Sequence, residues 1–200
     1  AGISVLGSTS YLAFYKALQL GPVAIISPIS ASYALVVILL AMIFMNERLS
    51  TGQAIGASAT IGGVVLTSLS LDGLRSRQRL VTTGVTLGLM ATLGMGLWQF
   101  SIGVLSKDMG WFLPVYISRI LTLGTLTPIA IFLGRWPWRQ TTRLLIVGII
   151  LAGIFEIGGL FAFTRGAELG IISIVAASST VYPIIPIIGG LVLFQARIGL

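Results

Sequence analysis

Two ionisable side chains lie inside long apolar stretches of this sequence, where a charge is costly. Glu156 lies near the centre of the stretch 144–165, and Arg119 lies about eight residues into the stretch 112–134. A charge at the middle of a bilayer costs about 2.5–3.5 kcal/mol on insertion scales, so such residues are functional candidates by default. We expect Glu156 and Arg119 to pair, or nearly pair, beside a cavity that binds a small molecule.

Other side chains are expected to reach the same depth. A helical rise of 1.5 Å per residue puts Trp98, Arg119 and Glu156 at roughly 12–16 Å from the nearest helix ends. Trp98 would form a flat apolar wall. Hydrogen bonds would come from Gln99, Ser30, Ser179, Tyr33 and Tyr182. The competing interpretation is a structural ion pair between Arg119 and Glu156 that holds two helices together and touches no substrate.

Several kinds of chemistry are excluded by what the sequence lacks. It has no Cys and no His, which excludes disulfides, thiolate or imidazole metal sites and a Ser-His-Asp group. No G-x4-G-K-[ST] loop is present, so no ATP hydrolysis is expected. One deep acid without a nucleophile–base pair makes an enzyme the weakest interpretation. We expect no cofactor and no bound metal.

The composition is that of a membrane protein. Charged residues make up 8% of the 200 residues, apolar residues make up 56%, and the mean hydropathy is +1.05, whereas soluble domains are about one quarter charged. The net charge of +7 reflects the 5 acidic residues against 12 basic ones. These bases lie between apolar runs rather than on a solvated face, so nucleic acid is not an expected partner.

Seven apolar stretches are each close to the roughly 20 residues that cross a bilayer. They run over about 2–20, 22–45, 52–71, 81–105, 112–134, 144–165 and 169–194. The expected fold class is therefore all-α, a polytopic bundle of about seven transmembrane helices. The alternative, buried helices of a large soluble core, lacks polar residues to cover them.

An internal repeat links the two parts of the chain. With an offset of 149, residues 10–50 align with 159–199 without a gap, and nine of 41 pairs are identical, including Gly21/Gly170 and Tyr33/Tyr182. Continuing the offset places further helices before the first residue and after the last, which gives five helices per repeat. Because five is odd, the second repeat would enter the membrane from the opposite side, as in many secondary transporters. We expect an internal fragment of a ten-helix protein.

The stretch 11–68 resembles the end of an EamA domain of the drug/metabolite transporter superfamily. The resemblance rests on Tyr15 to Leu18 before Gly21, on Asn46-Glu47-Arg48-Leu49-Ser50, and on Gly56 followed by Gly62-Gly63. It implies an EamA permease in which 1–71 is the end of the first repeat, 72–80 a linker and 81–200 the second repeat without its last helix. Glu47 falls opposite Ala196 in the repeat alignment, and we expect it to cap the start of the next helix.

The resemblance also implies a function. We expect a multi-pass exporter of small metabolites or drugs in the plasma membrane, most simply a bacterial inner membrane, working by alternating access in the lipid bilayer. Protons are a candidate coupling ion through Glu156, and the oligomeric state stays open. Two alternatives stay open as well: a phosphate-ester or anion exchanger of the same superfamily, and a non-transporting scaffold subunit, which would have a close-packed centre without a cavity.

Overall fold

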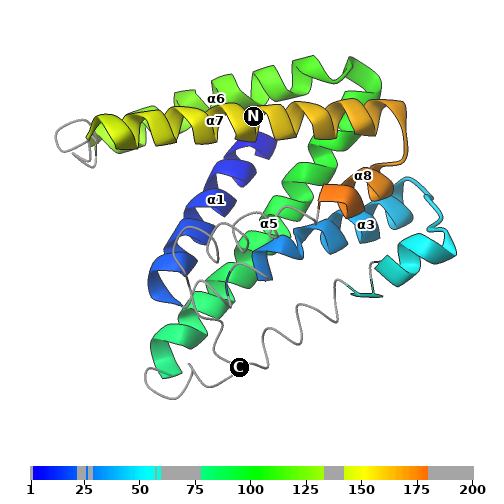
Figure 1. The fold of residues 1–200 in the computed structure, drawn as a ribbon, viewed down its shortest axis with the longest axis horizontal. Coiled ribbons are helices and arrows are strands. Elements are labelled where there is room, and N and C mark those ends of the chain that lie inside the picture. The colour runs from blue at the N-terminus through cyan, green and yellow to red at the C-terminus, as the bar shows by residue number, and fades with distance from the viewer. Residues whose placement is uncertain are drawn as a thin grey trace.

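The computed structural model describes residues 2–21, 26, 29–56, 58–59, 78–132 and 142–179. Within these ranges the regular elements are all helices (Figure 1), which confirms the predicted all-α class. They are α1 (Gly2–Leu20), α3 (Tyr33–Phe44), α5 (Gln78–Met109), α6 (Phe112–Phe132), α7 (Arg143–Leu169) and α8 (Ile172–Ser179). The candidate site residue Tyr182 and most of the stretch expected at 52–71 lie outside the described residues.

Three helices in the described part of the chain are long and apolar enough to cross a bilayer. These spans are Thr83–Met109, Phe112–Ile129 and Leu145–Leu169, and Ile29–Phe44 is a shorter apolar helix. Large apolar side chains are exposed along them, among them Leu123, Phe132, Ile149 and Phe155. Soluble monomers rarely expose apolar surface on this scale. The chain is therefore a multi-pass membrane protein.

The helix ends differ from those predicted. α5 begins at Gln78, inside the expected linker 72–80, and continues through Lys107 to Met109. α7 continues to Leu169, and its last turn holds an ion pair between Arg165 and Glu168 at 2.7 Å. The prediction treated charges as helix ends. A charged side chain in the last turn can instead reach the headgroups while its backbone stays helical.

α1 and α5 lie against each other in antiparallel directions (Figure 1) and pack through small residues. A Cβ atom added at Gly94 would overlap the Ser10 side chain, and one added at Gly84 would lie 3.0 Å from the Gly21 nitrogen. α3 approaches α5 in the same way, because a Cβ at Gly96 would lie 2.4 Å from the Val36 Cβ. Small residues allow this close approach of helices in lipid, where hydrophobic association is weak.

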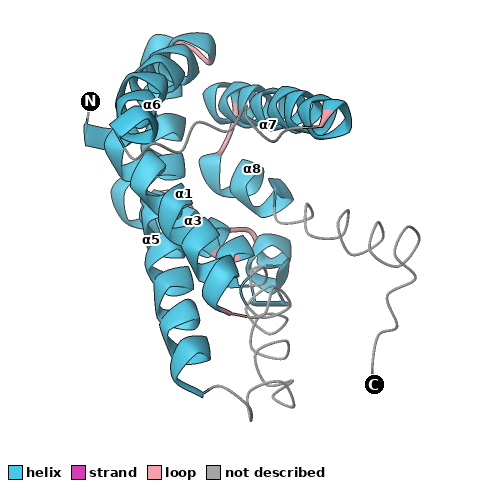
Figure 2. Cartoon of the chain, turned by 90° about the vertical axis from the view of Figure 1, so that its left-hand side faces the viewer, coloured by secondary structure: helices cyan, strands magenta, loops and turns pink. Residues whose placement is uncertain are grey.

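The other long helices cross this pair near the N-terminal end of α1. A turn at Gly110, which has a φ of 77°, connects α5 to α6, and Figure 1 shows α6 and α7 passing across the ends of α1 and α5. In Figure 2, α6 and α7 lie at the same end of the molecule, and α8 lies below α7. Side chains from α1, α5, α6 and α7 therefore converge where these four helices meet.

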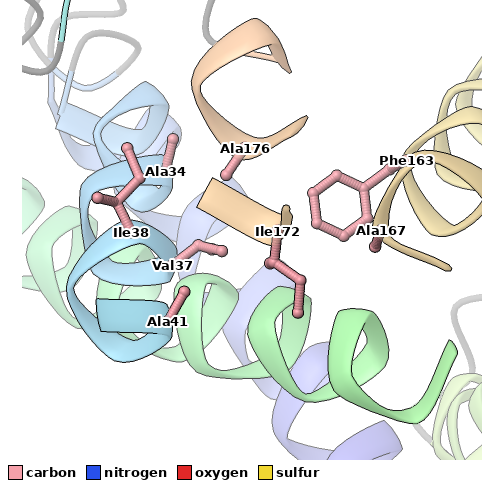
Figure 3. Packing of buried hydrophobic residues seen from close by; sticks show 8 residues of the cluster. All are labelled: Ala34, Val37, Ile38, Ala41, Phe163, Ala167, Ile172 and Ala176. Atoms are coloured by element: carbon pink, nitrogen blue, oxygen red, sulfur yellow. The ribbon is translucent and has the colours of Figure 1, made fainter. Parts of the chain in front are cut away.

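α3 and α8 pack antiparallel along an interface that we call the α3–α8 seam. Its buried core contains Ala34, Val37, Ile38, Ala41, Phe163, Ala167, Ile172 and Ala176 (Figure 3). At one end of the seam the hydroxyls of Tyr33 and Ser179 share a hydrogen bond of 3.2 Å. This seam joins the expected first repeat to the expected second repeat.

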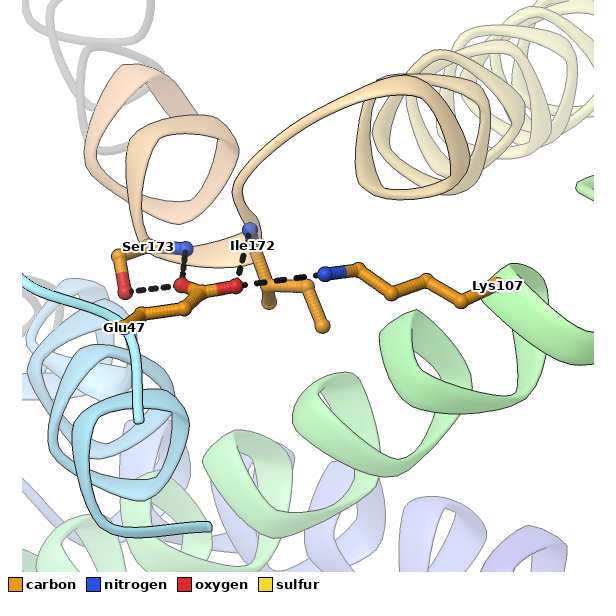
Figure 4. Close-up of polar contacts among 4 residues, drawn as sticks. All are labelled: Glu47, Lys107, Ile172 and Ser173. Atoms are coloured by element: carbon orange, nitrogen blue, oxygen red, sulfur yellow. Dashed lines mark hydrogen bonds and ion pairs between the residues drawn. The ribbon is translucent and has the colours of Figure 1, made fainter. Parts of the chain in front are cut away.

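Glu47 closes the other end of the seam. Its carboxylate accepts hydrogen bonds from the backbone N–H groups of Ile172 and Ser173 at 3.0 Å each and from the Ser173 hydroxyl at 2.7 Å. The Lys107 ammonium lies 3.4 Å from Oε1 (Figure 4). Glu47 therefore caps α8, so the prediction that it caps the next helix was wrong.

The next helical segment has a cap of its own. The Ser50 hydroxyl accepts a hydrogen bond from the Gln53 N–H at 3.4 Å, and the Gln53 side chain accepts one from the Ser50 N–H at 2.7 Å. This is the reciprocal pattern of a capping box at the start of the helical residues 51–56. Glu47 is left free to bind α8 because Ser50 already satisfies this helix start.

We predict that Gly96→Ala destabilises the protein by about 1–3 kcal/mol, because the added methyl group overlaps the Val36 Cβ and must push α3 away from α5. Gly124→Ala in α6 is the matched control, since no heavy atom lies within 4 Å of its added Cβ. Thermal unfolding in detergent measures both variants. Equal unfolding temperatures for the two would contradict close packing at Gly96.

Stability should also depend on the ionisation of Glu47. Burial alone would raise the pKa of this carboxyl group, but the hydrogen bonds from Ser173 and Ile172 and the Lys107 charge outweigh burial and lower the pKa below its ordinary value of 4.5. A lowered pKa contributes stability that is present above the ordinary value and lost as the pH falls below it.

We therefore expect the unfolding temperature of the wild type to fall more than that of Glu47→Gln between about pH 7 and about pH 4. At the higher pH the wild type should be the more stable protein, and near the lower pH the two should converge. Parallel curves over this range would show that the carboxylate does not carry this stability.

Candidate functional site

Two adjoining cavities lie where the helices converge. The first, of about 370 Å³, is lined by residues of α1, α5, α6 and α7. The second, of about 500 Å³, is lined by residues of α1, α3, α5, α7 and α8 and by Ser30. Tyr11, Trp98 and Glu156 line both cavities, so the two share a wall. Volumes of this size suit small organic molecules.

An ion pair lies on the wall of these cavities. The Arg119 Nη2 atom lies 2.5 Å from the Glu156 Oε1 atom, which joins α6 to α7. Glu156 is the central residue of α7, which runs over Arg143–Leu169, so it lies roughly 20 Å from either helix end at 1.5 Å per residue. The pair that helix depth predicted is therefore present, and it lies at mid-helix.

Arg119 keeps a donor that the ion pair does not use. Its Nε atom is buried and has no hydrogen-bond partner among the described residues. A buried donor without a partner costs about 1–3 kcal/mol.

Trp98 forms the apolar wall that the sequence predicted. Its side chain is buried, and the Tyr11 ring meets its indole edge-on at 5.9 Å between ring centroids. Gly7 makes room for the indole, because an added Cβ would lie 2.6 Å from the Trp98 Cδ1 atom. The indole of Trp98 can therefore pack here because Gly7 has no side chain.

Sequence reasoning missed the α1 face of the site. Gly7, Tyr11 and Tyr15 all line the first cavity, and their spacing of four residues places them on one face of a helix. Two tyrosines in register with a glycine were a readable signal.

The predicted hydrogen-bonding residues gather at the second cavity. Ser30, Tyr33, Gln99 and Ser179 all line it, and Tyr33 and Ser179 already bond each other. The Gln99 side chain is buried in the wall of this cavity. All predicted site residues except Tyr182, which lies outside the described residues, therefore line one or both cavities.

Comparison with known proteins links part of the chain to a protein family. The model of the EamA-like transporter family matches residues 1–69. These residues include the stretch 11–68 on which the resemblance rests. Within it lies Asn46-Glu47-Arg48-Leu49-Ser50, which we call the NERLS turn. Residues 1–69 are therefore similar to the EamA-like transporter family. This match confirms the predicted resemblance to an EamA domain of the drug/metabolite transporter superfamily.

A curated relative extends beyond the EamA match. The chain is 27% identical over 174 residues to human solute carrier family 35 member G1. The aligned region covers 82% of this chain and 47% of that protein. The chain thus spans about half the length of this relative. No solved structure matches the chain. The EamA segment contributes α1 and α3, and therefore Tyr11, Tyr33 and Glu47, to the features described above.

Exchanging the charges separates a binding role of the ion pair from a structural one. Arg119→Glu and Glu156→Arg alone each juxtapose like charges, and both should lower stability. The double variant restores the pair in reverse, so its unfolding temperature should return toward that of the wild type. If the pair also binds substrate, transport stays at least about tenfold reduced in the double variant, because each charge then faces the wrong group of the substrate. Full transport by the double variant would assign the pair a structural role.

Proposed function

We propose that this EamA-type protein carries a small organic molecule across the membrane by alternating access, with the two adjoining cavities as its binding site. The observation that carries the proposal is the Arg119–Glu156 pair, which lies at mid-helix and borders both cavities. Charges at this depth are retained at a cost that function explains. Binding near the middle of the membrane is also what alternating access requires.

The cavity walls favour a substrate with an apolar or aromatic body and one polar end. Six apolar side chains line the second cavity: Phe14, Met95, Trp98, Phe155, Leu160 and Phe163. The first cavity adds hydroxyls from Ser8 and Thr122 beside the ion pair. A polar group in the first cavity would bind to these hydroxyls and to the ion pair, while the body packs on Trp98. Metabolites and drug-like molecules of moderate size have this chemistry.

The repeat supports a rocking mechanism. α1 ends at Leu20 and α7 ends at Leu169, which is the same 149-residue offset that aligns the two halves of the sequence. The offset also relates Tyr33 to Tyr182 and Ser30 to Ser179. The bond between Tyr33 and Ser179 thus joins one repeat to the other.

Two alternatives fit less well. An anion exchanger needs several cationic groups in its cavity, but among the described lining residues Arg119 is the one cation, and Glu156 already neutralises it. A scaffold subunit needs a close-packed centre, whereas two cavities occupy the convergence point of the described helices. We propose export across a plasma membrane, with Glu156 as the residue through which protons would couple.

Metabolite profiles test the function directly. Cells that lack the complete protein should retain its substrate, and cells that overproduce it should release more of that compound into the medium. Compounds that change in opposite directions in the two strains are the candidates. If no compound does so, the export proposal is wrong.

Filling the cavities should stop transport of the compound found in this way. Gly153→Phe places a ring in the first cavity and Gly159→Phe places one in the second, and neither added Cβ meets an atom within 4 Å. We expect transport to fall at least about tenfold in each, because the ring occupies the volume that the substrate needs.

The same helix supplies matched controls for these variants. Gly148 and Gly158 also lie in α7 with no atom within 4 Å of an added Cβ, and neither lines a cavity. Gly148→Phe and Gly158→Phe should keep near wild-type transport. Retained transport in Gly153→Phe and Gly159→Phe, at equal protein levels, would place the substrate pathway elsewhere.

A further inference from the structure

We propose that Glu47 is a one-sided latch that holds the α3–α8 seam closed on one face of the membrane, and that its release opens the second cavity to water on that face. The inference rests on the proposed alternating access, since a latch matters only if the seam opens during transport. It goes beyond the binding site because Glu47 lies at the far end of the seam from the cavity.

Among the described residues, the polar contacts at this end of the seam all converge on the Glu47 carboxylate. Glu47 follows α3, while its partners lie at the start of α8 and in the last turn of α5 (Figure 4). Its side chain is 9% exposed. An anion at a helix N-terminus is stabilised by the unpaired N–H groups and by the helix dipole. Because one group accepts all these bonds, they break together when that group leaves.

Asn46 aims the carboxylate at α8. It has a φ of 53°, a left-handed conformation that Asn tolerates better than most residues. The chain turns back there, and the Glu47 N–H bonds the Ala41 carbonyl at 3.3 Å. The turn points the side chain across the seam instead of along its own segment.

The rest of the seam is suited to opening. Its core includes three alanines of α3 and α8, at positions 34, 41 and 176 (Figure 3), and small side chains contribute less apolar burial than Leu or Phe would. Tyr33, Ser179 and Phe163 lie at the inner end, where they also line the second cavity. Parting the seam would therefore connect that cavity to the face that carries Glu47.

The latch is present on one face because the repeat does not reproduce it. The offset places Ala196 opposite Glu47, although Arg48 is matched by Arg197. A methyl group accepts no hydrogen bond, so the equivalent helix start on the other face would have no carboxylate cap. The conformation closed on the Glu47 face is thereby favoured over its mirror state.

Cysteine labelling in sealed membrane vesicles tests the latch without a known substrate. The chain has no native Cys, and Gly159→Cys places a thiol in the wall of the second cavity where the added atom meets nothing within 4 Å. A membrane-impermeant maleimide is applied from the Glu47 face of the complete protein. Adding Glu47→Gln should speed labelling about tenfold or more, as expected for losing a charge-assisted hydrogen bond.

Three further variants make the result specific. Gly148 lines neither cavity. The labelling rate of Gly148→Cys, the control variant, should therefore not change when Glu47→Gln is added. Ser173→Ala removes one of the latch bonds while both N–H groups remain, so it should give a smaller increase and supports the test if Glu47→Gln does not fold. Oxidising Ala41→Cys and Ile172→Cys to a disulfide, which leaves the reporter thiol at position 159 free, should abolish the increase.

Unchanged labelling of Gly159→Cys in folded Glu47→Gln and Ser173→Ala proteins would overturn the latch. An increase that persists after cross-linking would overturn it too, because water would then enter by another route. Neither result touches the proposed function, which the cavity-filling variants test separately. Conversely, a labelling increase together with retained transport in Gly153→Phe and Gly159→Phe would keep the latch and reject the binding site.

Discussion

A carboxylate that leaves water needs a partner, and this constraint fixes contacts between helices that are distant in sequence. Glu156 joins α7 to α6 through Arg119, and Glu47 joins the end of α3 to α8 and to Lys107 of α5. In an apolar surrounding, removing one partner of such a pair leaves an uncompensated charge, which costs more than the pair itself contributes. The two acids therefore specify which helices meet, while apolar packing alone would permit many arrangements.

Close backbone approach supplies the complementary constraint. Gly96 lets α3 reach α5, and Gly7 lets Trp98 insert beside α1. Small residues also take part in the cavity walls, with Ala152 and Gly153 in the first cavity and Gly159 in the second. Packing and binding thus draw on one feature: small residues allow contact where helices run alongside each other and leave volume where they diverge.

The parts of the site that sequence could predict are those fixed by distance along a helix. A constant rise relates residue number to depth, so Arg119, Glu156 and Trp98 could be brought to one level before any contact was known. The partner of Glu47 could not be found in this way, because capping was reasoned locally whereas Ile172 lies 125 residues away. The continuation of α5 through Lys107 to Met109 and of α7 to Leu169 was missed because charge was taken as a stop signal. The spacing of Tyr11 from Gly7 could be seen in the sequence, but its contact with Trp98 depends on helices that only the fold brings together.

The NERLS turn gains a physical explanation from these contacts. Asn46 ends α3 in a left-handed conformation, Glu47 crosses to α8, and Ser50 opens the next helical segment through its box with Gln53. Each residue does a job that its neighbours cannot do, because the three contacts point in different directions from one short turn. Ser50 frees Glu47 from local capping, and Asn46 sets its direction. A carboxylate placed one residue earlier or later would lie on a different side of the turn, so the spacing within the motif follows from the contact across the seam.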